Sequence, residues 1–285
     1  YGFEDVVRTG TLELNSNFKG NMSNQFLATI TKVQTTRIFD GGVFPTIDVF
    51  TGTGNNYMSA GMDPFTYNNQ VINDVYTFID NFPSYLKKHT ITAGISYESQ
   101  KVGNMFMPAS NSYYAFNSLD DFINDRQPSY YAYTYSVVPG QKSVFSANLK
   151  IGQLGIYAQD EWAPSDRLKF TIGIRADQPI YYEDPLENPA ASALNFYDTD
   201  GNITNYSTGV WPKSTMLFSP RVGFKWDATK DRTLVVRGGT GIFTGRIPFV
   251  WLTNMPTNSG MYQFGARLRN SNATENAQLE NIVFS

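Results

Sequence analysis

The feature that most constrains the fold is a two-residue alternation of apolar and polar side chains on both sides of a short turn. After the turn, the apolar positions are Leu168, Phe170, Ile172, Ile174 and Ala176, and the polar or small positions are Lys169, Thr171, Gly173, Arg175 and Asp177. Before it, the apolar positions are Leu154, Ile156, Ala158 and Trp162, with Asp160 breaking the set. The pattern predicts a hairpin of two strands with one apolar face each. Alternation alone fits a soluble sandwich as well as a strand that faces lipid.

Hairpins of this kind recur along the chain. The predicted strand pairs are Thr11–Phe18 with Gln25–Arg37, Val75–Phe82 with His89–Gln100, Gln153–Trp162 with Arg167–Ala176, and Ser219–Trp226 with Arg232–Phe243. Long connections separate them at about residues 38–74, 101–150 and 177–218. Short turns alternating with long loops are typical of a membrane β-barrel, whereas a soluble domain seldom holds three structureless connections of this length.

Composition supports strands rather than helices as the membrane-crossing elements. The chain has 285 residues, 41% hydrophobic and 15% aromatic, and no apolar run long enough to cross a membrane as a helix. Its mean hydropathy of −0.33 suits strands of which lipid contacts only every second residue. A net charge of −3 gives no basic surface for nucleic acid. The absence of cysteine excludes disulfides, thiolate metal sites and cysteine nucleophiles.

Three runs resemble barrel segments of TonB-dependent outer-membrane receptors. They are YAQDEWAPSDRLKFTIGIRAD (157–177), FSPRVGFKWDATKDRTLVVRGGTGIFTGRIPF (218–249) and DNFPSYLKKHTITAGISYE (80–98). The resemblance is strongest to the Oar-like branch with carboxypeptidase-regulatory-like domains, common in Bacteroidetes. It lies mainly in the strands beside the turns and carries no information about the transported cargo.

The resemblance implies a segment of a large antiparallel transmembrane β-barrel in the bacterial outer membrane, with long extracellular loops and short periplasmic turns. We expect residues 1–285 to supply about eight strands of a barrel of about 22, as part of one barrel domain. A further strand is possible at Met261–Asn270. Neither end resembles a natural terminus, so we expect the plug domain and both native termini to lie outside this chain.

The function that the resemblance implies is active uptake of a bulky nutrient, energised by the TonB–ExbB–ExbD system through the plug. The expected partners are outer-membrane lipid and an oligosaccharide, peptide or protein ligand. Two alternatives stay open: a surface or secreted β-sandwich that binds carbohydrate, and a small passive barrel of eight strands.

The alternation also predicts which side chains face lipid. Arginine on the lipid face near the bilayer centre costs about 2–4 kcal/mol, so charged residues belong on the lumenal side. We expect outward-facing side chains at Leu168, Phe170, Ile172, Ile174, Val222, Phe224 and Trp226. We expect Arg175, Arg221 and Lys225 to face the lumen.

One segment has the appearance of a calcium loop, with oxygen ligands at Asp198, Asp200 and Asn202. The glutamate that completes such a loop does not follow at the expected distance, so a plain Asp-Gly turn is favoured. The glycines of residues 238–245 lie in a strand pattern instead of preceding a helix, which favours a tightly curved wall over a phosphate-binding loop.

No pattern predicts catalysis or a cofactor. His89 is the only histidine, and no nucleophile motif accompanies it, so we interpret it as a polar residue at the rim. Asp160 and Glu161 are adjacent on a strand and point to opposite faces, which prevents them from acting together as an acid/base pair. For Asp120 and Asp121, the sequence gives no distance between the two carboxylates, so it does not indicate an acid/base pair there either. The sequence therefore predicts a protein that is not an enzyme.

The segment 110–140 is the strongest candidate for ligand contact, because it is long and rich in tyrosine. The candidate side chains are Tyr113, Tyr114, Tyr130, Tyr131, Tyr133 and Tyr135. Tyrosine offers a flat apolar face and a hydroxyl, which suits stacking on sugars or gripping peptides, although tyrosines also pack loops together. Within the segment, residues 118–124 predict a short capped helix.

Overall fold

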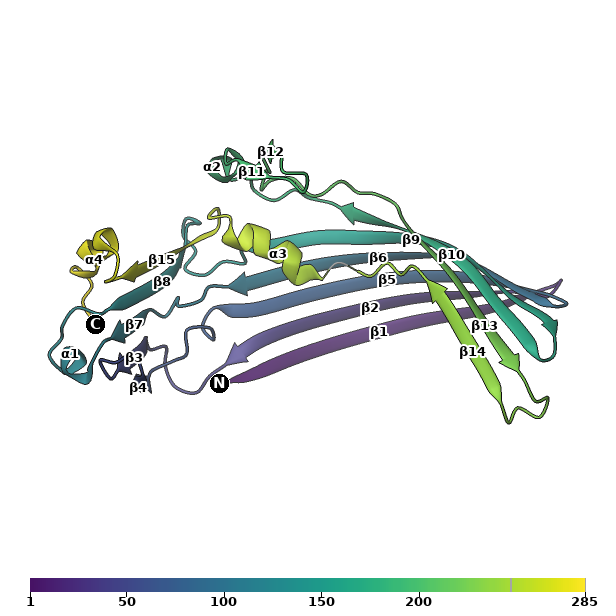
Figure 1. The fold of residues 1–285 in the computed structure, drawn as a ribbon, viewed down its shortest axis with the longest axis horizontal. Coiled ribbons are helices and arrows are strands. Elements are labelled where there is room, and N and C mark those ends of the chain that lie inside the picture. The colour runs from purple at the N-terminus through teal and green to yellow at the C-terminus, as the bar shows by residue number, and fades with distance from the viewer. Residues whose placement is uncertain (247, 285) are drawn as a thin grey trace.

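A computed structural model describes residues 1–246 and 248–284 and shows one large antiparallel sheet with a smaller sheet beyond one end (Figure 1). The large sheet has eight strands in the order β1-β2-β5-β6-β9-β10-β13-β14. Their bounds are Gly2–Phe18 (β1), Met22–Ile38 (β2), Asn69–Leu86 (β5), His89–Phe106 (β6), Ala147–Ser165 (β9), Leu168–Tyr181 (β10), Leu217–Asp227 (β13) and Val235–Gly241 (β14). Within the described residues β1 and β14 do not pair, so the sheet is open. The predicted antiparallel β architecture is confirmed.

The four hairpins turn at the same end of the sheet, as the sequence predicts. Residues 19–21, 87–88, 166–167 and 228–234 form the turns, which gather at the right of Figure 1. At the first of them, Gly20 and Asn21 have φ angles of 91° and 59°, the left-handed region that glycine and asparagine tolerate best.

Two prolines predicted to lie in turns are instead parts of strands. β5 continues through Pro83 to Leu86, and β9 continues through Pro164 to Ser165. Pairing between β2 and β5 is interrupted opposite Pro83, and the β9–β10 register shifts close to Pro164. A missing N–H donor is tolerated where the ladder is already irregular. The fourth hairpin differs in the other sense, because its second strand starts at Val235 and not at Arg232.

The long connections contain secondary structure of their own, which the sequence interpretation as loops missed. A five-stranded sheet has the order β15-β8-β7-β3-β4, and a separate pair is formed by β11 and β12. Their bounds are Thr46–Phe50 (β3), Asn56–Ala60 (β4), Tyr113–Phe116 (β7), Tyr130–Ser136 (β8), Phe196–Tyr197 (β11), Ile203–Thr204 (β12) and Gln263–Arg269 (β15). The further strand expected at Met261–Asn270 is thus present as β15, but it pairs with β8 in the small sheet and not with a strand of the large sheet.

The described residues also form four short helices: α1 (Leu119–Ile123), α2 (Pro189–Ser192), α3 (Phe249–Asn258) and α4 (Ala273–Leu279). The predicted capped helix is confirmed as α1, where the Ser118 hydroxyl accepts the Asp121 backbone N–H at 3.1 Å. Among the described residues, no helix has the length and apolar character needed to cross a membrane.

Among residues 1–246 and 248–284, no second sheet packs on the apolar face of the large sheet. Ile172 and Ile174, at the middle of β10, are 52% and 51% exposed, and Val222, Phe224 and Trp226 beside them on β13 are also exposed. A sandwich would bury this face against another sheet, so the β-sandwich alternative is not supported. Buried cores occur elsewhere: one around Ile47, Val49, Tyr114 and Phe116 in the small sheet, and one around Ala147, Leu149 and Trp211.

Candidate functional site

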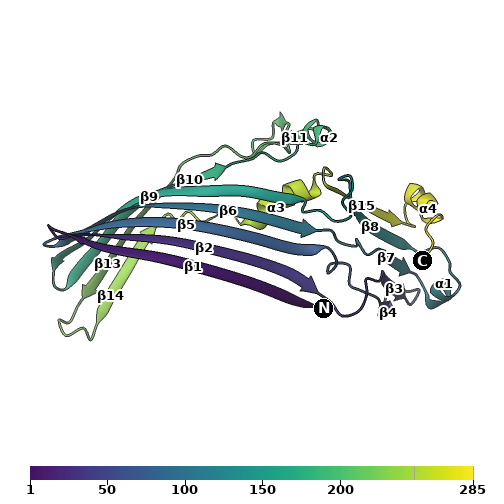
Figure 2. The same ribbon diagram turned by 180° about the vertical axis from the view of Figure 1, so that it is seen from behind.

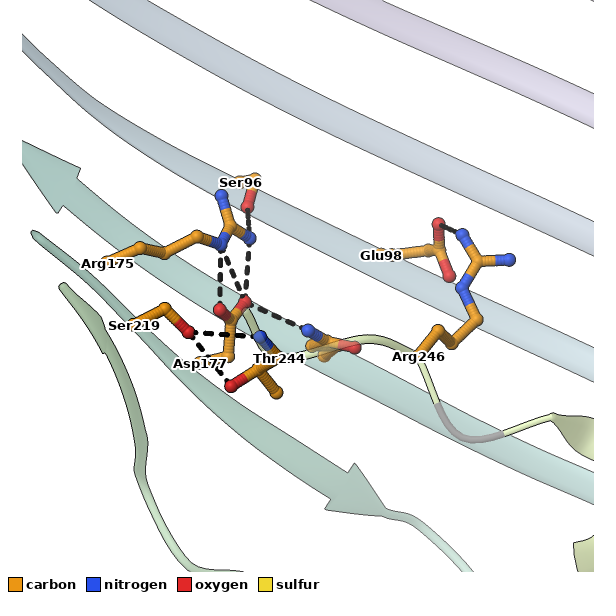
Figure 3. A network of polar contacts seen from close by, with 8 residues as sticks. Ser96, Glu98, Arg175, Asp177, Ser219, Thr244 and Arg246 are labelled. Atoms are coloured by element: carbon orange, nitrogen blue, oxygen red, sulfur yellow. Dashed lines mark hydrogen bonds and ion pairs between the residues drawn. The ribbon is translucent and has the colours of Figure 1, made fainter. Parts of the chain in front are cut away.

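The opposite, polar face of the large sheet carries a network centred on Asp177, shown in Figure 3. The Arg175 Nε donates to both Asp177 carboxylate oxygens at 2.9 and 2.8 Å, and its Nη2 donates to Oδ1 at 2.7 Å. Gln153 donates to the same Oδ1 at 2.9 Å, and Arg175 also donates to the Ser96 hydroxyl at 2.8 Å. The Asp177 side chain is only 1% exposed, so its charge is stabilised by these donors in place of water.

Glycines on this face give the long side chains room to lie flat across a neighbouring strand. Arg175 on β10 crosses Gly155 on β9 to reach Ser96 on β6, and a methyl group at Gly155 would collide with the guanidinium. Two more side chains repeat the arrangement. Tyr157 crosses Gly94 to donate to Asn81, and Arg221 crosses Gly173 to donate to Gln159 at 2.7 Å.

These contacts test the predicted orientation of the charged residues. Arg175 and Arg221 both lie on the face opposite the exposed isoleucines, and Lys225, four residues after Arg221 on β13, lies on the same face. The sequence interpretation of these three residues as facing away from the apolar surface is therefore confirmed. The sequence did not indicate their partners, because each belongs to another hairpin: Ser96 on β6 accepts from Arg175, and Gln159 on β9 accepts from Arg221.

The chain that follows β14 crosses the polar face, and we call residues 242–246 together with α3 the strap. In Figure 1 it passes in front of β6 and β9, and it leaves the sheet where the Ile242 N–H donates to the Pro220 carbonyl at 2.9 Å. Ser219 and Thr244 then exchange hydrogen bonds through their hydroxyls at 2.9 Å and from the Thr244 N–H at 3.2 Å. Arg246 forms an ion pair with Glu98 on β6.

At its far end the strap packs on the second buried core. Leu252 and Met255 of α3 lie against the cluster that contains Trp211, and the Ser146 hydroxyl donates to that of Thr257 at 3.0 Å. Beneath the strap is a cavity lined by residues that include Glu98, Gln100, Gln153 and Asp177. The buried Gln100 Oε1 in its lining has no hydrogen-bond partner among the described residues. Apolar side chains, among them Ile151, Leu217 and Leu252, line the same cavity, so the strap covers a compartment of mixed character without filling it.

The six candidate tyrosines lie on two strands of the small sheet, β7 and β8, and differ in accessibility. Tyr114 is buried and packs on Tyr131 at 5.0 Å between ring centroids, so it stabilises the sheet. Tyr133 and Tyr135 stack on each other at 6.0 Å, are 37% and 41% exposed, and continue onto Phe264 of β15. These last three rings form the exposed aromatic surface of the small sheet.

The other candidate tyrosines belong to the opposite face of the small sheet. Tyr113 donates to the Asp48 carboxylate at 2.6 Å and lies edge-on to Tyr130 at 5.4 Å. Burial and the hydrogen bond to Asp48 raise the pKa of Tyr113, so its hydroxyl keeps the proton that it donates. Tyr130 lies beneath the Arg269 guanidinium, whose central carbon is 5.7 Å from the ring centroid.

The segment with the appearance of a calcium loop is the turn between β11 and β12. The Asp198 Oδ1 accepts the backbone N–H groups of Asp200 and Asn202 at 2.9 and 2.8 Å. The hydrogen bond from the Asn202 backbone lowers the pKa of Asp198. Among the described residues, no group of three or more His, Cys, Asp or Glu side chains is arranged to hold a metal ion. Through these hydrogen bonds the Asp198 carboxylate organises the turn.

The remaining polar residues singled out in the sequence have structural partners. His89 Nδ1 lies 2.7 Å from the Asp160 carboxylate, and its ring stacks on Trp162 at 6.0 Å. Glu161 pairs on the other face with Lys169 at 2.6 Å, so the two adjacent carboxylates diverge as expected.

Two further sequence expectations concern Asp120 with Asp121 and the glycine-rich segment. Both carboxylates bind Arg126, at 2.8 and 3.2 Å, which ties them to one cation. Glycine at 238 and 239 is required by close neighbours: the Phe224 ring approaches the first and the Val222 carbonyl the second. The interpretation as closely packed barrel backbone is thus confirmed for residues 238–241 of β14, and it is wrong for residues 242–245, which leave the sheet in the strap.

An antiparallel sheet with one exposed apolar face, one polar face and all its tight turns at one end defines the wall of a membrane-spanning β-barrel. The sequence matches a family model described as "Outer membrane beta barrel domain" over residues 1–284, and the chain belongs to that family. A comparison with curated proteins found no match. The protein is therefore located in the bacterial outer membrane, its apolar face contacts lipid, and its polar face lines the lumen.

Proposed function

We propose that the intact protein imports a bulky nutrient across the outer membrane with energy delivered through TonB. The observation that carries the proposal is that the wall is open: its eight strands pair in sequence, yet the edge strands β1 and β14 do not pair with each other among the described residues. A wall that continues beyond eight strands encloses a wide lumen, and wide lumens of transporters are closed by a plug. The resemblance of the hairpins around Trp162 and Trp226 to TonB-dependent receptors of the Oar-like branch supports the same function.

The strap fits this proposal as the part of the chain that narrows the passage on the side of β6, β9 and β10. Its contacts with the wall are few and polar, apart from the packing of α3. A polar lumen with a partly covered wall suits a hydrophilic cargo. In this proposal the plug, supplied by a part of the protein outside this chain, closes the rest of the lumen and transmits the pull of TonB.

The proposal is tested by the ion conductance of the intact protein in a planar lipid bilayer. A transporter with a plug should show no steady conductance, because the lumen is closed until TonB acts. Uptake in cells should stop when TonB is deleted. A stable open channel in the bilayer, together with solute entry that is independent of TonB, would establish a passive barrel instead.

We further propose that the exposed aromatic surface, Tyr133, Tyr135 and Phe264, contacts the cargo. The rings are half exposed and stacked, and they lie on the small sheet at the end of the wall opposite the tight turns (Figure 2). Short turns mark the periplasmic end of such barrels, so the small sheet faces the cell exterior. Flat rings on a rigid sheet suit an oligosaccharide or a peptide.

Replacing Tyr133 and Tyr135 with alanine in the intact transporter should weaken cargo binding by roughly tenfold or more, since hot-spot aromatics are often worth about 2 kcal/mol. Uptake of labelled oligosaccharides and peptides is the measurement, with surface abundance followed by antibody. The matched control replaces Tyr197 and Tyr206, which are also exposed but lie in the β11–β12 region. Equal uptake by both double variants at normal abundance would place recognition elsewhere.

A further inference from the structure

The lipid-facing side of the wall carries a row of charged residues in continuous register across five strands. Arg8 pairs with Lys32, Lys32 with Asp74, Asp74 with Lys101, and Lys101 with Lys150. Residues paired in this way share one face of the sheet, so all five side chains belong to one surface. We call it the basic row.

The basic row lies directly beyond the apolar belt. Two residues closer to the turns than Lys32 and Asp74, the same face carries Ile30 on β2 and Tyr76 on β5. Two residues closer again, it carries Leu12 on β1 and Phe78 on β5. From Arg8 to Phe18 is ten residues of β1, which at about 3.3 Å per residue and the tilt of barrel strands spans roughly 25 Å of bilayer. On β1, the basic row therefore lies at the extracellular boundary of the hydrocarbon.

The charge of the row is unbalanced. It contains four cations and one carboxylate, and within the described residues none of the four cations forms an ion pair. All four cations are exposed. The Lys150 ammonium lies 4.9 Å from the centre of the Tyr182 ring, which in turn hydrogen-bonds Tyr97 through its hydroxyl. Aromatic residues at this depth are typical of the membrane interface.

We propose that the basic row binds the phosphate groups of lipid in the outer leaflet. Lysine stems extend along the apolar belt while their ammonium groups reach the headgroups, where phosphate oxygens accept charge-assisted hydrogen bonds. Because barrel strands tilt, a row perpendicular to them changes depth along its length. The row therefore contacts headgroup phosphates over a range of depths instead of at one ring.

The occupant is a lipid because of where the row lies. It continues the surface that contacts hydrocarbon, so any molecule that reaches it is in the membrane and has an apolar part beside Ile30 and Phe78. Its charge is complementary to an anionic headgroup. The inference depends on the barrel wall and its location and is independent of the transport proposed above.

The test is binding of bisphosphorylated lipid A to the intact protein in a neutral detergent, compared with lipid A from which the phosphates have been removed. Each lysine near a charged lipid surface contributes about fivefold in affinity, so Lys32→Gln, Lys101→Gln and Lys150→Gln together should weaken binding of the phosphorylated lipid by about 100-fold. The single variant Lys101→Gln should weaken it about fivefold, which keeps the test valid if the triple variant folds poorly. Binding should also decline as salt rises.

The matched control replaces Lys19, Lys87 and Lys230 with glutamine, which removes the same amount of charge from the periplasmic turns. This control variant should bind the phosphorylated lipid within about twofold of the parent. Equal binding by the parent and the Lys101→Gln variant, or equal affinity for the phosphate-free lipid, would overturn the proposal. Displacement of the lipid by millimolar inorganic phosphate would also overturn it, since the site would then select a free anion.

Discussion

Ile174→Arg should lower the free energy of unfolding of the intact protein by about 2 kcal/mol, because it places a guanidinium on the lipid face between the bilayer midplane, where arginine costs about 2–4 kcal/mol, and the extracellular interface. Ile174 is 51% exposed and lies seven residues along β10 from Arg167, or roughly 18 Å into the membrane once the strand tilt is included. Denaturant unfolding of the protein in lipid vesicles, followed by tryptophan fluorescence, measures the change.

The control for this substitution is Thr171→Arg on the same strand. Thr171 lies on the lumenal face, opposite Glu161 of β9, so an arginine there remains hydrated and has a carboxylate within reach. We expect a change of no more than about 1 kcal/mol. A cost at Thr171 equal to or above that at Ile174 would mean that the two faces have been assigned the wrong way round.

Asp177→Ala should also cost about 2–4 kcal/mol, because it leaves the Arg175 guanidinium without its main acceptor in a partly buried position. The Asp177 side chain accepts from Arg175 and Gln153 and is 1% exposed, whereas Arg175 is 37% exposed, so the cost lies below that of a fully buried pair. Adding Arg175→Met to Asp177→Ala removes the unpaired charge. The double variant should therefore be at least as stable as Asp177→Ala alone.

A surface pair provides the comparison for this cycle. Arg126 and Asp120 are 2.8 Å apart, but both side chains are more than half exposed, so Asp120→Ala should change the free energy of unfolding by less than about 1 kcal/mol. The same unfolding measurement applies to all of these variants. Additive effects of Asp177→Ala and Arg175→Met would show that the two side chains do not act as a unit.

The wall of the barrel could be predicted from the sequence because its physics is local. Lipid on one side and water on the other impose a two-residue period, and this alone placed Ile172 and Arg175 on opposite faces. The strand ends were predicted less well. Pro83 and Pro164 resemble turn residues, yet both occupy strands at points where the ladder is irregular.

The lumenal network could not be predicted in the same way, since its partners are far apart in the chain. Arg246 and Glu98 are separated by 148 residues, and nothing in either local sequence indicates the other. The glycines at 94, 155 and 173 were an available signal, because glycine at lumenal positions of successive strands leaves room for a neighbour to cross.

The tyrosine segment shows a third kind of limit. Tyr131, Tyr133 and Tyr135 alternate with Tyr130, Ala132 and Thr134, which is a strand pattern, but the length of the connection favoured a loop. In the structure these residues form strand β8 of the small sheet. Within that sheet Tyr114 is buried, whereas Tyr133 is exposed. Composition indicated that aromatic residues gather here, and only pairing with β7 and β15 determined which of them remain accessible.

The central claim, that the sheet is a barrel wall with lipid on one side and an aqueous lumen on the other, is tested most directly by accessibility along β10. This chain contains no cysteine, so single cysteines at each position from 169 to 176 can carry a spin label once any other cysteine of the intact protein is replaced. Labels at 170, 172, 174 and 176 should collide mainly with oxygen dissolved in the lipid, and labels at 169, 171, 173 and 175 mainly with a water-soluble nickel complex. Uniform accessibility along the strand, or a period other than two, would contradict it.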